Sequence, residues 1–223
     1  MEAGERHRLA QEVLAGYVSG PAAATEATRR ALLRVGDAQG VVLVEGISDQ
    51  IAVETLAIRS GRDLDEAAVV VVPVGGAHGV TAFLERFGPR GADLRLSGMC
   101  DEAEETVFRR GLTRSGLGSP VTRADMERLG FFVCVEDLED ELIRAVGAYL
   151  TESIMETQGD LGSFRTLQAQ PAWRGRDTEA QLRRFVSAGA RRKLRYAKLL
   201  VEAIPLDRVP RALEGVLSFV LEG

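Results

Sequence analysis

The sequence is poor in the residues that most often build redox centres and zinc sites. Its 223 residues include two cysteines, Cys100 and Cys134, and two histidines, His7 and His78. Two cysteines cannot form a disulfide framework or a cysteine-rich zinc site, and the two histidines lie far apart in the sequence. We therefore expect buried structural thiols and no histidine-rich metal site.

Several sequence features that would place the chain in other protein classes are also missing. No apolar run approaches the ~20 residues that cross a bilayer, and residues 1–18 are charged and amphipathic, with no signal-peptide core. These absences predict a cytoplasmic protein with no membrane partner. The chain has neither the G-x-x-x-x-G-K-[ST] phosphate loop of ATPases nor the G-x-S-x-G turn of serine hydrolases.

The hydrophobic pattern alternates between strand-like and helix-like segments. Apolar runs predict strands at 41–45, 68–74, 94–99 and 131–135, and helical patterns at 48–59, 79–87, 102–112 and 138–157 separate or follow them. Such alternation requires crossover connections and so predicts an α/β fold with a mostly parallel sheet flanked by helices.

Helices are also expected on both sides of this core. The pattern predicts a helical segment over 1–39, an α/β core over 40–157 and a helical region over 158–223, with helices at 5–18, 22–36, 177–186, 189–204 and 210–221. Segments 116–130 and 163–176 are expected to be connections, and Ser48 is the expected N-cap of the helix over 48–59.

Acidic residues follow the predicted strands where each strand ends. Glu45 ends the first strand, Asp101 follows the third, Asp49 lies one helical turn beyond Glu45, and Glu104 and Glu105 lie one turn beyond Asp101. The carboxyl ends of parallel strands form the ligand-binding edge of such sheets. Carboxylates that converge there repel one another and favour a hard cation, Mg²⁺ or Mn²⁺, which can assist phosphoryl transfer.

The charge is distributed unevenly, although the net charge is only −5. Acids outnumber bases over 96–141, and bases outnumber acids over 160–215. The most basic stretch carries Arg191, Lys193, Arg195 and Lys198 on a predicted helix, where 191, 195 and 198 are expected to share an exposed face while 194, 197 and 201 face inward. A basic helix can follow a nucleic-acid backbone without reading its sequence. A solvated surface without a partner explains the same stretch equally well.

Three segments of the predicted core carry the acidic residues and the glycine pair: VLVEGISDQIAVETLA, VVPVGGAHGV and RLSGMCDEAEE. Together they resemble a Toprim domain, the catalytic fold shared by topoisomerases, bacterial primases, OLD-type (overcoming lysogenization defect) nucleases and RecR-like recombination proteins. The Glu-Gly-x-x-Asp spacing that ends at Asp49, the pair Gly75 and Gly76, and the DLED segment at 137–140 are most similar to the OLD-type branch. The resemblance implies a Toprim-like, Rossmann-like core.

The resemblance also implies roles for particular residues. Glu45 and Gly46 match a Glu-Gly motif whose glutamate is assigned general acid/base work. Asp101 matches the leading aspartate of an Asp-x-Asp motif that holds Mg²⁺. Ala103 stands where the second aspartate is expected, and Glu104 or Glu105 is the candidate replacement. Glu45 and Asp101 are thus the expected catalytic pair, with Asp49 as a further metal ligand.

The implied function is a metal-dependent nuclease or nucleotidyl-transfer protein that acts on DNA or RNA, with DNA the favoured partner and with Lys193 and its neighbours contacting phosphate. OLD nucleases carry an ATPase module before the Toprim domain. The residues before Glu45 leave no room for one, so we expect a separate ATPase partner; a homodimer is also considered. Two alternatives stay open. One is a catalytically silent Toprim module that binds nucleic acid or a protein partner in DNA repair or phage defence, which Ala103 favours. The other is a small-molecule phosphohydrolase.

Overall fold

A four-stranded, all-parallel sheet forms the centre of the protein. A computed structural model describes residues 3–222. The strands are β1 (Gly40–Val44), β2 (Val69–Pro73), β3 (Arg95–Asp101) and β4 (Phe131–Cys134), in the order β2-β1-β3-β4. The predicted α/β fold with a parallel sheet is therefore confirmed, and each predicted strand is present within two residues of its expected ends.

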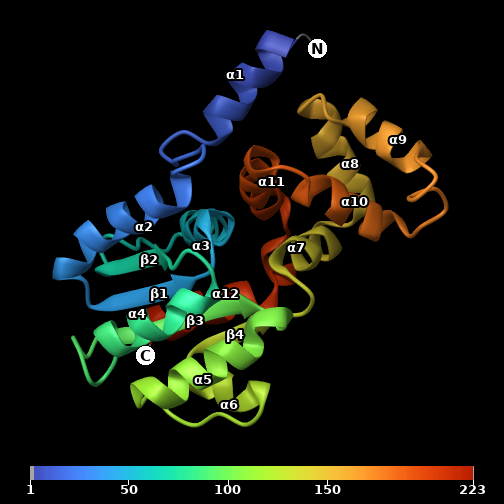
Figure 1. Cartoon of the computed structure of the whole chain (residues 1–223). Coiled ribbons are helices and arrows are strands. Elements are labelled where there is room, and N and C mark those ends of the chain that lie inside the picture. Colours follow the sequence, from blue (N-terminus) through green and yellow to red (C-terminus); the bar gives the residue numbers. More distant parts are fainter. Residues whose placement is uncertain (1–2, 223) are drawn as a thin grey trace.

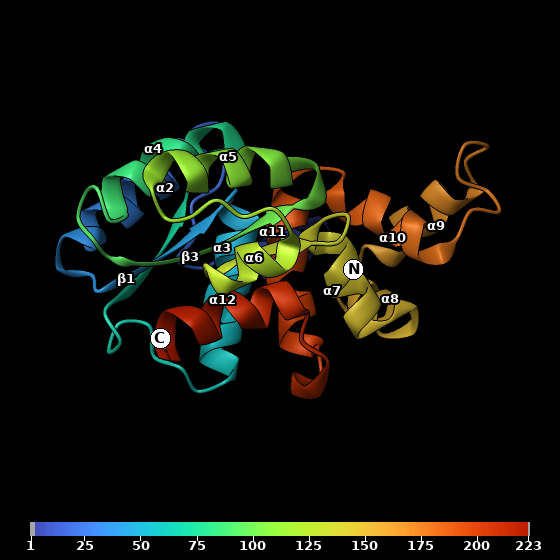
Figure 2. The ribbon, with the colours of Figure 1, turned by 90° about the horizontal axis from the view of Figure 1, so that it is seen from below.

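The strands are apolar on both faces because helices cover both faces. Val41 and Leu43 contribute to the core beneath α2 (Ala23–Arg34), α4 (Val80–Phe87) and α5 (Glu105–Ser115). Val42 and Val44 contribute to the opposite core, against α3 (Ile47–Arg59) and α12 (Arg211–Glu222). Figure 2 shows this layering, with α2, α4 and α5 on one side of the sheet and α3 and α12 on the other.

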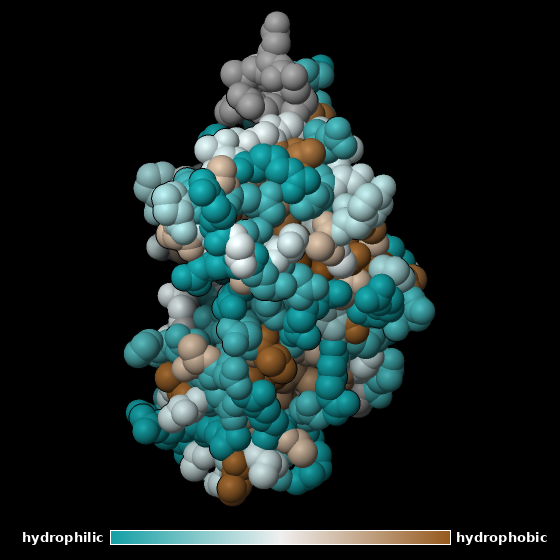
Figure 3. Space-filling model, turned by 90° about the vertical axis from the view of Figure 1, so that its right-hand side faces the viewer, coloured by the Kyte–Doolittle hydropathy of each residue, from teal (hydrophilic) through white to brown (hydrophobic). Residues whose placement is uncertain are grey.

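The remaining helices lie at the periphery of the sheet and extend the molecule (Figure 1). They are α1 (Ala3–Val13), α6 (Arg123–Arg128), α7 (Leu138–Val146), α8 (Ala148–Thr157), α9 (Leu161–Ala169), α10 (Thr178–Ser187) and α11 (Ala190–Ala203). Short 3₁₀ turns are η1 (Val35–Asp37), η2 (Ala77–Gly79), η3 (Glu102–Glu104) and η4 (Leu206–Arg208). The side of the molecule that faces the viewer in Figure 3 is mostly hydrophilic, with apolar residues in scattered patches.

Helix α11 matters for the site because it packs against both α3 and α7. Leu194, Ala197 and Val201 on its inner side are buried. Its carboxyl end is held by Arg59 of α3, whose Nη1 donates to the carbonyl oxygens of Val201 at 2.5 Å and Ile204 at 2.6 Å. Such charge-assisted bonds to the last carbonyls of a helix are favourable, and they fix α11 beside α3.

Several local predictions were wrong, for reasons that backbone geometry explains. The N-cap of α3 is Gly46 rather than Ser48. The helix expected over 138–157 is two helices, because Gly147 adopts φ +84, a conformation that breaks an α-helix. The expected connections at 116–130 and 163–176 contain α6 and most of α9. Thr122 caps α6 by accepting a hydrogen bond from the Asp125 N–H at 3.1 Å.

No helix among residues 3–222 combines the length and the apolar character that a membrane span requires.

Candidate active site

Glu45 and Asp101 lie together at the carboxyl edge of the sheet. β1 and β3 are adjacent parallel strands, so the residues that follow Val44 and Cys100 emerge side by side. The Glu45 Oε1 accepts a hydrogen bond from the backbone N–H of Asp101 at 3.0 Å. The two residues at the centre of the sequence prediction are therefore in direct contact.

Asp49 joins them from the first turn of α3. Its Oδ2 accepts a hydrogen bond from the Gly46 N–H at 3.0 Å, which satisfies a free donor at the start of the helix. The residue is only 9% exposed. Asp49 therefore has a structural role as a helix cap and also adds negative charge beside Glu45.

Glu139 and Lys193 complete this group, although only Lys193 was predicted to contact a ligand. The Lys193 Nζ lies 3.1 Å from the Glu139 Oε2. Glu139 is 2% exposed, and its Oε1 has no hydrogen-bond partner among the described residues. Glu139 belongs to the DLED segment noted above, and Lys193 is one of two lysines in a sequence whose other basic side chains are arginines. These two signals draw attention to each residue separately, but neither indicates that the two side chains meet.

Burial and mutual repulsion shift the pKa values of these carboxyl groups upward. Burial, followed by the charges of Asp49 and Glu45, raises the pKa of Asp101 to about 8. Burial raises the pKa of Glu139 to about 7, although Lys193 opposes the shift. Burial also raises the pKa values of Glu45 and Asp49. Several buried carboxyl groups with raised pKa values in one place are typical of a functional site.

Lys193 shows the complementary behaviour. Burial tends to lower the pKa of its amine, but the charges of Glu139 and Asp49 outweigh burial, and the pKa is raised overall. Lys193 is therefore a permanent cation at neutral pH and the positive charge within the acidic group.

A pocket of about 390 Å³ opens over these side chains. Glu45, Asp49, Asp101 and Lys193 all line it, together with Arg191 and Gly76. Its volume falls within the range of small-molecule and cofactor sites.

The glycine pair contributes through its backbone. Gly75 and Gly76 have φ values of +76 and +105, which side-chain-bearing residues rarely adopt. The Gly76 N–H donates to the Glu45 carbonyl at 3.1 Å and ties this loop to the end of β1. Gly46 has an extended backbone, φ −146, that places no such demand on the residue.

Not every predicted ligand joins the group. Glu105 pairs with Arg109 and with Arg123, whose Nε lies 2.7 Å from its Oε2. Glu104 is half-buried, and its charge contributes to the raised pKa of Glu45. Glu104 is therefore the better candidate for an additional ligand beside Glu45, because the charge of Glu105 is already paired with two arginines.

The basic residues of α11 do not form one exposed surface, because they contact different parts of the protein. Arg195, expected to be exposed, is 8% exposed and pairs with Asp160, which also accepts a hydrogen bond from the Tyr196 hydroxyl at 3.0 Å. Arg195 was therefore placed wrongly, because α11 is packed on more than one side. Lys198 lies beside Glu202 at 3.9 Å and lines a separate pocket. Arg191 and Lys193 are the basic residues of this stretch that line the carboxylate pocket.

The acidic group offers the carboxylate oxygens that a divalent cation prefers, but these oxygens do not converge on a single position that an ion could occupy. Among residues 3–222, no three histidine, cysteine, aspartate or glutamate side chains already stand in a ready metal-binding arrangement. Two observations favour a cation nonetheless: the Glu139 oxygen has no partner, and the pKa of Asp101 is raised partly by neighbouring carboxylates. Oxygen ligands of this kind are those that Mg²⁺ and Mn²⁺ prefer, and ligation would require the side chains to turn toward one ion.

The raised pKa values predict that stability falls as pH rises. Each of these carboxyl groups has a higher pKa in the folded than in the unfolded protein, so the native state holds more protons between the two values. Their stabilising contribution is complete below pH ~4 and is lost as pH rises through the folded values, about 7 for Glu139 and about 8 for Asp101. Thermal or urea unfolding in EDTA should show a loss of several kcal/mol between pH 5 and 8, with a slope of about 1.4 kcal/mol per pH unit for each group that titrates.

The same experiment has an internal control. Exposed acids with lowered pKa values, such as Glu26, act in the opposite direction but only at more acidic pH. Asp101→Asn should flatten the decline, and Mg²⁺ or Mn²⁺ should raise the melting temperature more at pH 8 than at pH 5. A stability that stays level or rises from pH 5 to 8 would contradict the assignment.

Comparison with known proteins supports the resemblance inferred from the motifs. Residues 38–93 match the family described as overcoming lysogenization defect protein-like, TOPRIM domain. No curated protein sequence matches the chain. The match covers Glu45, Gly46, Asp49 and the glycine pair, so the OLD-like Toprim resemblance is confirmed over this segment.

Solved structures extend the similarity to the fold of most of the chain. The C-terminal region of the Xanthomonas campestris pv. campestris OLD protein is similar with a TM-score of 0.65 and 23% identity, covering 85% of this chain and 95% of that one. The C-terminal region of the Burkholderia pseudomallei OLD protein gives a TM-score of 0.62 and 19% identity, covering 83% and 98%. The sheet and its flanking helices therefore have the Toprim-like fold of those regions.

Proposed function

We propose that the protein is a metal-dependent phosphodiesterase, a nuclease, that acts on nucleic acid at the carboxylate pocket. The observation that carries the proposal is the meeting of Glu45, Asp49, Asp101 and Glu139 around Lys193 at the carboxyl edge of a parallel sheet. Ligands of parallel α/β folds bind at this edge. The OLD-like Toprim match over residues 38–93 supports the same class of activity.

The chemical roles follow from the environments of the side chains. Burial raises the pKa of Glu45, and its Oε1 accepts a hydrogen bond from the Asp101 backbone N–H, so Glu45 suits general acid/base work. Asp49, Asp101 and Glu139 supply the oxygen ligands for Mg²⁺ or Mn²⁺, and Glu104 is the candidate additional ligand. The bound ion would polarise the phosphodiester and neutralise charge that develops during cleavage.

The basic residues of the pocket would contact the substrate backbone. Lys193 and Arg191 line the pocket together with the acidic group and can pair with phosphate oxygens. We propose DNA rather than RNA as the substrate, and a separate ATPase as a partner. The similar solved structures are C-terminal regions of OLD proteins, which is compatible with action beside another module.

A catalytically silent nucleic-acid-binding module is the second candidate. Ala103, which is exposed, stands two residues after Asp101, where the resemblance leads one to expect a second aspartate. The absence of that carboxylate weakens any site that requires two closely held cations.

Metal removal tests the proposal directly. Purified protein should cleave or nick single- and double-stranded DNA substrates, tested separately, in the presence of Mg²⁺ or Mn²⁺, and EDTA should abolish the reaction. Refilling with Mn²⁺ after EDTA treatment should restore it. DNA binding without turnover in any metal would select the silent module, whereas turnover of free nucleotides alone would select a small-molecule phosphohydrolase.

A further inference from the structure

Residues from the N-terminal part of the chain form one wall of the carboxylate pocket. The segment between α1 and α2, together with the first turn of α2, contributes Ser19, Gly20, Pro21, Ala23 and Ala24 to the pocket lining. We call these five residues the N-terminal wall. They stand before the segment that matches the Toprim family, so the family match does not include them.

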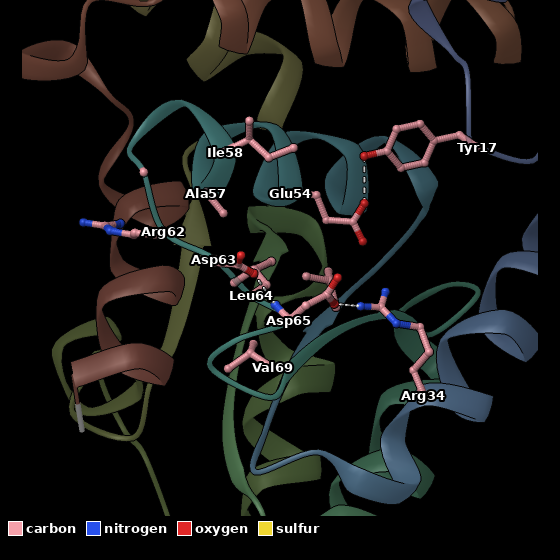
Figure 4. Close-up of a pocket in the computed structure, with 12 residues that line it drawn as sticks. Tyr17, Arg34, Glu54, Ala57, Ile58, Arg62, Asp63, Leu64, Asp65 and Val69 are labelled. Atoms are coloured by element: carbon pink, nitrogen blue, oxygen red, sulfur yellow. Dashed lines mark hydrogen bonds and ion pairs between the residues drawn. The ribbon is translucent and has the colours of Figure 1, made fainter.

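Contacts on both sides hold the N-terminal wall in place. Before it, the Tyr17 hydroxyl donates to the Glu54 Oε2 on α3 at 2.7 Å, and Figure 4 shows Tyr17 directed at Glu54 across the gap between the two segments. After it, the Thr28 hydroxyl lies 2.6 Å from the Pro73 carbonyl at the end of β2. The N-terminal wall is therefore anchored to α3 just before it in the sequence and to the end of β2 just after it.

A small apolar cluster lies beneath the same segment. Leu14 and Ala27 are buried with Ile51 of α3 and Leu194 of α11, and Tyr17, Val18 and Ala23 pack against them. Burial of these side chains stabilises the position of the wall, because exposing them would return apolar surface to water.

The first turn of α11 lines the same pocket. Ala190, Arg191, Lys193 and Leu194 contribute to it, together with Glu45 and Asp49. Leu194 also belongs to the apolar cluster against which Ala23 packs, so the N-terminal wall and α11 meet beside the carboxylates. The carboxylates therefore lie in a pocket of about 390 Å³ that the N-terminal wall and α11 both line.

We propose that the N-terminal wall makes the site selective for an unpaired strand over continuous duplex. This inference rests on the proposed function and narrows its substrate class to single-stranded nucleic acid, or to ends and junctions with unpaired nucleotides. A flexible single strand can bend so that one phosphodiester enters this pocket, whereas a stiff duplex holds its phosphates on the outside of the double helix and cannot insert one between the N-terminal wall and α11 without bending or unpairing. Enzymes that hold a nucleotide in a closed pocket act on single strands or extrude the nucleotide, and extrusion costs unpairing energy.

Binding measurements test the wall separately from catalysis. The Glu45→Gln variant, with Mg²⁺ present, should bind a 30-nucleotide single strand at least about tenfold more tightly than the blunt duplex of the same sequence. Equal affinity, or tighter binding of the duplex, overturns the inference whether or not the wild type cleaves. A preference for the single strand combined with no turnover in wild type supports the wall and contradicts the nuclease proposal alone.

Variants in the wall provide the structural control. Ala24 and Ser19 are exposed and line the pocket, so Ala24→Trp and Ser19→Trp should narrow the entrance and weaken single-strand binding about tenfold or more. Thr25→Trp places the same side chain on the neighbouring exposed residue of α2, which does not line the pocket, and should bind like the parent. Melting temperatures verify folding. If all three variants bind alike, the wall does not control access.

Discussion

Replacing Glu45 by glutamine is expected to lower metal-dependent cleavage by about 10²–10⁴-fold, the usual contribution of a general acid or base. The change removes charge and proton transfer while keeping the size of the side chain. The hydrogen bond from the Asp101 N–H to Oε1, 3.0 Å in the structure, can form with glutamine as well. The loss should therefore appear in kcat at substrate saturation, with the fold intact.

The change at Glu45 can be compared with changes elsewhere in the same experiment. Asp101→Asn should cause a loss of similar size, because Asp101 lines the same pocket and its pKa is raised by burial and by the charges of Asp49 and Glu45. Glu66→Gln, on an exposed loop, should leave activity within about twofold, as surface substitutions usually do. If Glu45→Gln keeps activity near that of Glu66→Gln, then Glu45 is not part of the reaction.

Stability should move in the opposite direction to activity. Glu45 and Asp101 carry carboxyl groups whose pKa values are raised by burial and by the charge of Asp49, and the charge of Glu45 raises the pKa of Asp101 further. Neutral amides remove this repulsion, so Glu45→Gln and Asp101→Asn should unfold at the same or a higher temperature than wild type at pH 8. Functional sites commonly lower stability in this way. An unchanged or higher unfolding temperature of the variants would exclude misfolding as the cause of their inactivity.

The sheet could be predicted from the sequence because its signals are local. The unbroken run Val41–Val44 is apolar on both faces, as a strand covered by helices on both sides must be. The position of Glu45 then followed from the rule that ligands bind at the carboxyl ends of parallel strands. The direct contact between Glu45 and Asp101 required only that β1 and β3 be neighbours, which crossover connections make common.

The parts that could not be predicted depend on long-range packing. Helical periodicity placed Arg195 on an exposed face, but α11 contacts α3, α7 and α10, and Asp160 pairs with Arg195 from outside the helix. Glu139 and Lys193 are far apart in the sequence, and nothing local indicates that α7 and α11 bring them together. The N-cap of α3 was misplaced because the helix begins after Gly46, whose backbone N–H donates to the Asp49 side chain. Glycine has no side chain with which to cap a helix, so the sequence pattern favoured Ser48.

Lys193 is the residue whose role changed most between sequence and structure. The sequence placed it on a basic surface that follows nucleic acid, whereas the structure places it 3.1 Å from buried Glu139 and within the carboxylate pocket. Its raised pKa keeps it charged, so it cannot serve as a general base. A fixed cation beside a phosphodiester can instead stabilise negative charge as it develops on the phosphate oxygens.

Lys193→Met is therefore expected to lower kcat by about 10²–10³-fold, the usual cost of removing one preorganised group that stabilises developing charge. Methionine keeps most of the apolar stem and removes only the ammonium. Arg208→Met, an exposed cation outside the pocket, should change kcat by less than about twofold. An activity for Lys193→Met above half that of wild type would contradict this role.

Glu139 allows the structural and chemical contributions of Lys193 to be separated. Without Lys193, both oxygens of buried Glu139 lack a partner. Lys193→Met should therefore unfold more easily at pH 8, where the Glu139 carboxyl must either ionise without a partner or keep a proton that the unfolded protein releases. The double variant Lys193→Met/Glu139→Gln removes the unpaired charge and should recover most of the lost stability. Cleavage should remain low in the double variant, because the cation that faces the phosphate is still absent. Recovery of cleavage together with stability would show instead that Lys193 serves only to neutralise Glu139.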